Sequence, residues 1–189
     1  MRQCLSQLAS ASFAKACART TWREEGSCAA EVDLVGESEA LETDVLGGIV
    51  AKASNSYGGF HGDGAAFAEI HYTDDRVLGE IEQSAKWKEL PFDEDIEALA
   101  YGVSTEKNGV SISVGPYLTE DGEPLLPQVQ NGYYYFRDRH DQALDPYDAS
   151  QTLSRASLNV TLAIYDTDSR ELYYCEFREF RSVRVGRLP

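Results

Sequence analysis

The chain has 189 residues, 42% of them hydrophobic, and carries 32 acidic against 17 basic side chains, for a net charge of −15. This length and composition fit a single domain with a substantial core. The charge argues against nucleic-acid binding and against docking on anionic lipid, because both need clustered Lys and Arg. It favours either plain solubility or a surface that attracts a basic protein or peptide.

The N-terminal segment lacks a sustained pattern of large apolar side chains. Its apolar residues are interrupted at Ser6, Gln7, Ser10, Ser12 and Lys15, so a secretory signal peptide is not predicted. No stretch of the sequence approaches the roughly 20 apolar residues that cross a membrane, so membrane insertion is not predicted either. We therefore expect a cytoplasmic protein with a loosely ordered or partly helical segment over residues 1–45, one domain over 46–180 and a tail over 181–189.

Two strands joined by a glycine-rich connection open the predicted domain. Residues 49–53 and 66–72 are rich in strand-forming side chains, and the connection between them contains Tyr57-Gly58-Gly59-Phe60-His61-Gly62-Asp63-Gly64. A helix is predicted next, over residues 73–89. Thr73 begins it, and the apolar residues that follow, Trp87 among them, recur at helical spacing.

The second half of the domain is predicted to be mostly strands. A strand is expected at residues 96–102, and Asn108-Gly109 predicts a hairpin turn before a strand at 110–114. Aromatic residues predict a strand at 133–138, and alternation predicts a final hairpin from 158–165 and 171–177. The fold class is therefore α+β, an antiparallel sheet built from hairpins with one main amphipathic helix on one face.

The four cysteines show no metal-ligand spacing. Cys4, Cys17 and Cys28 lie near the N-terminus, and Cys175 lies in the last predicted strand, where a thiol usually acts as a small buried hydrophobe. The sequence leaves undecided whether Cys17 and Cys28 form a disulfide bond. We predict no metal site and no cofactor.

The glycine-rich connection is the first candidate site. It places Phe60, His61 and Asp63 on an unusual backbone path, where the imidazole could serve as a base or binding group with Asp63 beside it. The alternative is that Asp63-Gly64 is turn chemistry and His61 is an ordinary polar loop residue.

A second candidate site follows the aromatic strand. Asp138 and His140 could act as a pair, and Arg137 and Arg139 could bind an anionic group, since a guanidinium matches a carboxylate or phosphate. Tyr134 is a predicted contact residue of the same strand. The alternative is a solvated strand end with local ion pairs. Ser154 and Ser157 lie nearby in sequence, but only geometry can establish a Ser-His-Asp triad.

Several segments together resemble a group of small proteins from gut-dwelling Firmicutes. The resemblance spans roughly residues 46–178, and many of these proteins begin with a membrane-anchoring or lipoprotein-type segment. Beside the cytoplasmic expectation it therefore implies the alternative of a cell-envelope origin, if the true start of the protein differs. It implies a common fold and no particular chemistry. The segments that carry it are Gly59-Phe60-His61-Gly62-Asp63-Gly64, Trp87-Lys88-Glu89-Leu90-Pro91, Asn131-Gly132-Tyr133-Tyr134, Ala163-Ile164-Tyr165-Asp166-Thr167-Asp168 and Tyr173-Tyr174-Cys175-Glu176.

Two functions fit these observations. The first is a non-catalytic binding protein, which the acidic surface and the supply of tyrosines favour. The second is a hydrolase or transferase that uses His61, Asp63, Asp138 and His140, which requires the two candidate sites to converge. Whether His61 and His140 share one pocket would separate the two.

Overall fold

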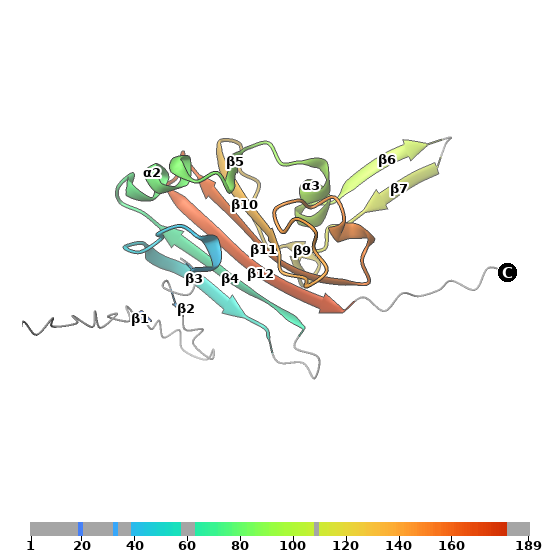
Figure 1. The fold of residues 1–189 in the computed structure, drawn as a ribbon, viewed down its shortest axis with the longest axis horizontal. Helices are drawn as coiled ribbons and strands as arrows, with labels where there is room; N and C mark the ends of the chain where they lie inside the picture. Colours follow the sequence, from blue (N-terminus) through green and yellow to red (C-terminus); the bar gives the residue numbers. More distant parts are fainter. Residues whose placement is uncertain (1–18, 21–31, 34–38, 58–62, 108–109, 181–189) are drawn as a thin grey trace, which may run out of the picture.

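A computed structural model describes residues 19–20, 32–33, 39–57, 63–107 and 110–180. Its main feature is a six-stranded antiparallel sheet in the order β3-β4-β12-β11-β10-β5 (Figure 1). The strands are β3 (Ile49–Asn55), β4 (Gly64–His71), β5 (Trp87–Glu89), β10 (Gly132–Asp138), β11 (Ser157–Asp166) and β12 (Glu171–Phe180). The predicted antiparallel sheet is confirmed, and β3–β4 and β11–β12 are the hairpins expected at each end of the domain.

The single long helix predicted over residues 73–89 is wrong. Helix α2 spans only Arg76–Gln83, and the backbone is extended at Ser84. Trp87 then begins β5, where it pairs with Tyr135 of β10. Trp87 keeps the helical spacing of the apolar residues before it, but the helix has already ended and Trp87 is paired with the sheet instead.

The strand predicted at residues 96–102 is a helix. Helix α3 spans Glu94–Ala100, and its first turn carries Glu94, Asp95 and Glu97. Acidic side chains there are favourable because the helix dipole is positive at that end. With a further helical turn at residues 39–41, three short α-helical segments among the described residues replace the one predicted.

Both faces of the sheet are covered. Helix α2 and the segment around Leu41 and Val45 pack on one face, while α3 and the chain around Leu118 and Leu126 pack on the other. The central strand β11 is consequently buried on both sides, with Leu162 and Ile164 on the α3 face and Ala163 and Tyr165 on the α2 face. No helix among the described residues is long and apolar enough to cross a membrane.

Smaller elements lie between α3 and β11. Strands β6 (Val103–Lys107) and β7 (Val110–Val114) form a hairpin, as predicted, and it projects away from the main sheet (Figure 1). Val110 and Ile112 on it are 60% and 48% exposed. Strands β8 (Thr119–Glu120) and β9 (Glu123–Pro124) pair with each other, and the 3₁₀ helix η1 spans Thr152–Ser154. A further pair, β1 (Arg19–Thr20) with β2 (Val32–Asp33), is antiparallel.

Gly115 fixes the base of the projecting hairpin against α3. It has φ +72°, and a Cβ placed on it would lie 1.9 Å from the carbonyl oxygen of Ala98. Gly115→Ala should therefore lower the free energy of unfolding by at least about 2 kcal/mol, through backbone strain and overpacking. Urea denaturation followed by circular dichroism measures the change.

Gly79→Ala is the matched control for this prediction. Gly79 lies in α2, and a Cβ there would meet nothing within 4 Å, so alanine should stabilise the protein by about 0.5–1 kcal/mol. Equal losses in the two variants would show that the close approach of Gly115 to α3 does not matter.

Candidate functional site

A polar pocket of about 410 Å³ opens at one end of the main sheet. It lies where β10 ends, where β11 begins and where β12 ends. Asp63, from the first candidate site, lines this pocket together with Arg139 and His140, from the second. The remaining lining residues are Asp141, Ser157, Leu158, Asn159, Arg178 and Glu179. Part of each predicted site therefore lies in one pocket; Phe60 and His61 lie outside the described residues.

The strand register explains why these residues meet. Antiparallel pairing places Arg178 of β12 opposite Asn159 of β11 on one side and opposite Gly64 of β4 on the other. Gly64 follows Asp63 in the chain, so the end of the glycine-rich connection is brought beside the last residues of β12. Its φ is +153°, and a Cβ would lie 2.7 Å from the Cα of Tyr57, so this close approach needs a glycine.

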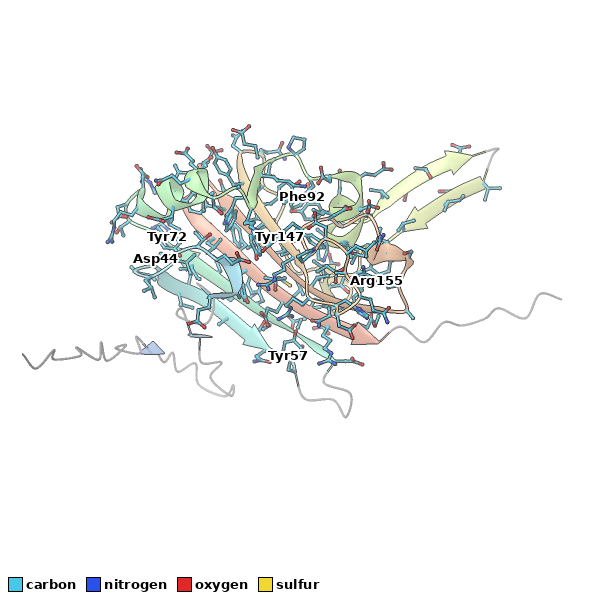
Figure 2. The ribbon with its side chains drawn as sticks, viewed as in Figure 1. Asp44, Tyr57, Tyr72, Phe92, Tyr147 and Arg155 are labelled. Carbon is cyan, nitrogen blue, oxygen red and sulfur yellow. The ribbon has the colours of Figure 1, made fainter. Side chains whose placement is uncertain are left out.

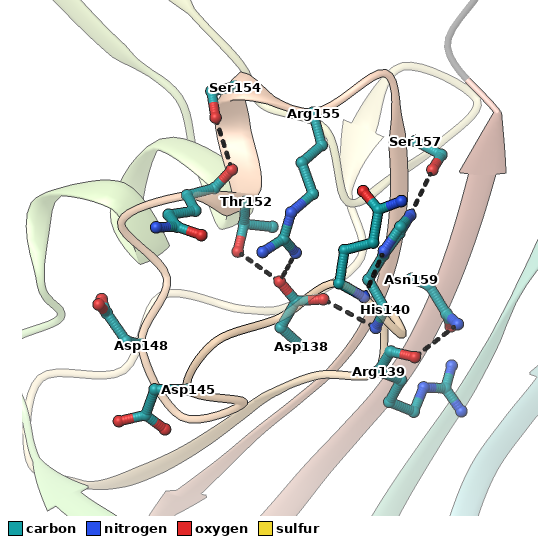
Figure 3. Close-up of polar contacts among 12 residues, drawn as sticks. Asp138, Arg139, His140, Asp145, Asp148, Thr152, Ser154, Arg155, Ser157 and Asn159 are labelled. Carbon is teal, nitrogen blue, oxygen red and sulfur yellow. Dashed lines mark hydrogen bonds and ion pairs between the residues drawn. The ribbon is translucent and has the colours of Figure 1, made fainter.

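Asp138 belongs to the structure of the adjoining loop and not to the pocket. Its buried carboxylate forms an ion pair with Arg155 and accepts hydrogen bonds from the Thr152 hydroxyl at 3.3 Å and the backbone N–H of His140 at 2.9 Å (Figure 3). The predicted Asp138–His140 side-chain pair does not form. Instead, Asp138 ties the segment around residues 140–155 to the end of β10.

Arg139 is held firmly beside the pocket. Its Nη1 lies 2.7 Å from a carboxylate oxygen of Glu176, and its backbone carbonyl accepts a hydrogen bond from the side-chain amide of Asn159 at 3.2 Å. Burial is the largest single influence and lowers the pKa of Arg139, but Glu176 and Tyr57 together outweigh it, and the pKa is raised. Tyr57 lies at the same end of the sheet, opposite the end that carries Tyr72 (Figure 2). Burial raises the pKa of Tyr57, and the nearby charge of Arg139 opposes that rise.

Two other predicted binding residues lie elsewhere. Arg137 faces Glu42, with 3.6 Å between Nη1 and the carboxylate oxygen, and does not line the pocket. Tyr134 is 2% exposed and packs edge-on against Phe92 in the core under α3. The Tyr134 ring is therefore part of the hydrophobic core and is not exposed for binding.

His140 makes the contacts that decide the chemistry of the pocket. Its Nε2 lies 3.2 Å from the hydroxyl oxygen of Ser157 and its Nδ1 lies 3.0 Å from a carboxylate oxygen of Asp141, as in a Ser-His-Asp arrangement. The backbone N–H of Gln142, however, donates to the same Nδ1 at 3.2 Å. The two contacts of Nδ1 require opposite protonation, because the Gln142 N–H needs a lone pair on Nδ1 and the Asp141 carboxylate needs a proton there; each tautomer of a neutral His140 therefore satisfies one contact and not the other.

The arrangement departs from a Ser-His-Asp triad at the acidic member. A general base needs its Nδ1–H held by a carboxylate, so that Nε2 can accept the Ser157 proton. The Asp141 side chain, which would orient the ring in a triad, is 90% exposed and competes with water.

Sequence reasoning missed Arg178, Glu179 and Asn159. The pairing of the final hairpin could have located these residues. Asp166 pairs with Glu171 next to the turn, and each further pair lies one residue earlier in β11 and one residue later in β12. This pairing places Asn159 opposite Arg178 and Leu158 opposite Glu179. Arg155 was missed as well, since nothing in the sequence pairs it with Asp138.

The remaining site chemistry is limited. Cys175 is fully buried, as predicted, and burial raises the pKa of its thiol to about 12, so it is no thiolate nucleophile; Cys4, Cys17 and Cys28 lie outside the described residues. Within the described ranges, no three His, Cys, Asp or Glu side chains are grouped so that they could hold a metal ion. No known protein family, curated protein or solved structure matches the chain.

Proposed function

We propose that this protein is a non-catalytic binding protein, and that the pocket at the end of the sheet holds its small ligand. The observation that carries this proposal is the 90% exposure of the Asp141 side chain, the carboxylate beside His140 Nδ1, because the acidic member of a triad is normally buried and orients the ring. The Gln142 N–H competes for the same nitrogen, so the His140–Ser157 contact supports the loop instead. A pocket with rigid polar walls and no activated nucleophile is suited to binding.

The lining favours a small zwitterionic ligand, such as an amino acid or the end of a peptide. Arg178 and Arg139 supply positive charge, and Asp63, Asp141 and Glu179 supply negative charge around the same hollow. Arg139 is already paired with Glu176, so Arg178 is the cation better placed to receive a carboxylate. A volume of about 410 Å³ lies within the range of small-molecule pockets.

A serine hydrolase is the second candidate function. The 3.2 Å contact between His140 Nε2 and Ser157 favours it, because a ring with its proton on Nδ1 would accept the Ser157 proton at Nε2 and activate the hydroxyl. The fluorophosphonate experiment below distinguishes the two functions, since such reagents label only serines with an activated hydroxyl.

We expect no labelling of the purified protein by a fluorophosphonate probe, with a known serine hydrolase labelled in the same reaction as the positive control. In parallel, titration with a panel of free amino acids and dipeptides should move the backbone ¹⁵N–¹H signals of Asn159 and Glu179. The same titration should leave those signals in place in Arg178→Ala, an exposed position whose replacement should not disturb folding.

Labelling that disappears in Ser157→Ala and in His140→Ala would overturn the proposal in favour of the hydrolase. If neither labelling nor a saturable shift occurs with any amino acid or dipeptide, the zwitterion-binding proposal is wrong. Equal shifts in the wild type and Arg178→Ala would mean that the ligand sits outside this pocket.

A further inference from the structure

A second hollow, of about 240 Å³, lies beside α3 and away from the polar pocket. Figure 2 shows Phe92, which lines it, next to α3 and well separated from Tyr57. Most of its surface is apolar or aromatic, in contrast to the pocket described above. The lining residues are Leu90, Pro91, Phe92, Glu97, Tyr101, Gln128, Val129 and Gln130, and we refer to this hollow as the α3 groove.

The walls of the α3 groove are fixed by contacts within the protein. The rings of Phe92 and Tyr101 have centroids 5.7 Å apart, and Phe92 is anchored in turn on the buried ring of Tyr134 at 5.0 Å. The Tyr101 hydroxyl donates to the carbonyl of Pro127 at 2.5 Å, which joins the end of α3 to the opposite wall. The groove is thus preformed, and filling it requires little reordering of side chains.

The rim of the α3 groove is acidic. Glu97 lines it directly, and Glu94 lies one helical turn earlier on the same face of α3; both side chains are exposed. Burial and then the neighbouring Glu97 raise the pKa of Tyr101 to about 12, consistent with the carboxylate lying close to the ring. Asp93 lies just before the helix, where it pairs with Lys88 at 2.8 Å, so that cation is already neutralised.

We infer that the α3 groove binds a short basic segment of a partner protein or peptide. A bulky apolar side chain of that segment fills the hollow between Phe92, Tyr101 and Val129, and a neighbouring Lys or Arg pairs with Glu97 and Glu94. Charge complementarity determines the choice of occupant: the rim is negative and the whole chain carries −15. This inference uses none of the residues of the polar pocket and does not depend on the zwitterion proposal.

The test is fluorescence anisotropy with three labelled ten-residue peptides that alternate Lys with Leu, Lys with Ser, or Glu with Leu. The Lys/Leu peptide should bind most tightly, because only it offers both the apolar group and the charge. Glu94→Gln/Glu97→Gln should weaken its binding about fivefold to tenfold, the effect of two exposed ion pairs. The control Glu120→Gln/Glu123→Gln removes the same charge from the exposed β8–β9 hairpin and should change the affinity less than twofold.

Each other outcome overturns the inference. Equal weakening by the two double variants means that net charge alone attracts the peptide. Equal binding of the Lys/Ser and Lys/Leu peptides means that the groove is not filled, and equal binding of the Glu/Leu peptide means that the acidic rim has no role. Absence of binding by all three peptides rules out a basic peptide as the occupant.

Discussion

Replacing Arg155 with methionine is expected to lower the free energy of unfolding by about 3–5 kcal/mol. Arg155 forms an ion pair with Asp138, and the two side chains are 15% and 1% exposed. Without the guanidinium, the Asp138 carboxylate stays in the protein interior and keeps the Thr152 hydroxyl and the His140 N–H as its hydrogen-bond partners. Urea denaturation, with the tryptophan fluorescence and circular dichroism transitions compared, measures the loss.

The double variant Asp138→Asn/Arg155→Met separates the ion pair from packing. An amide carries no charge to desolvate, so the double variant should recover a large part of the stability that Arg155→Met loses. A loss below about 1 kcal/mol in Arg155→Met would mean that water reaches Asp138 readily and that the pair behaves as a surface salt bridge.

Trp87→Ala should cost about 3–5 kcal/mol, the usual effect of removing a large buried aromatic side chain. The ring is 6% exposed, and its centroid lies 5.7 Å from that of Tyr135. Its indole N–H donates to the hydroxyl of Thr43 at 2.9 Å, which ties the segment before β3 to the edge strand β5. Chemical denaturation monitored by circular dichroism gives the change in stability without relying on the fluorescence of the removed residue.

Trp87→Phe isolates the hydrogen bond. It keeps most of the apolar contact and removes the indole donor, so it should cost less than Trp87→Ala, with about 1 kcal/mol of its loss due to the missing bond. Thr43→Val removes the acceptor of this bond and also the hydroxyl that donates to the Leu41 carbonyl at 3.0 Å, so it should cost more than the missing indole bond alone; the two changes together should be less than additive. Fully additive losses would show that the two residues do not depend on each other.

The sequence predicted the strands better than the helices, for physical reasons. The final hairpin alternates apolar residues over its whole length and has a polar turn, so both the strands and their pairing follow from the pattern. Residues 96–100, by contrast, hold four apolar side chains and Glu97 in a segment too short for its pattern to separate a strand from a helix. The acidic first turn, Glu94 and Asp95 after Asp93, was the available helix signal. Trp87 was assigned to the preceding helix because it keeps the helical spacing of the apolar residues, although it lies in β5 and pairs with Tyr135.

The candidate site was predictable only in part. Asp63, Arg139 and His140 were found because their residue types and positions at strand ends are typical of sites, and they do line one pocket. Their neighbour Asp138 was predicted to belong to the same site. Successive residues of a strand point to opposite faces of the sheet, so Asp138 and Arg139 could not both face the pocket, but the sequence does not say which face carries it. Asp138 shares the α3 face with Tyr134 and Phe136, whereas Arg139 shares the other face with Arg137. The face that carries the pocket is decided by how the loops after β10 and before β4 pack against the end of the sheet.

The two ends of the projecting β6–β7 hairpin join the rest of the protein at nearly the same place. A Cβ on Gly115, which follows β7, would lie only 3.3 Å from the Cα of Gly102, which precedes β6. Strands β6 and β7 leave the body and return to nearly the same place, and Figure 1 shows them extending away from the main sheet. The hairpin is therefore a natural position for length variation: it can be shortened, extended or exchanged for another domain while the two cores keep their packing.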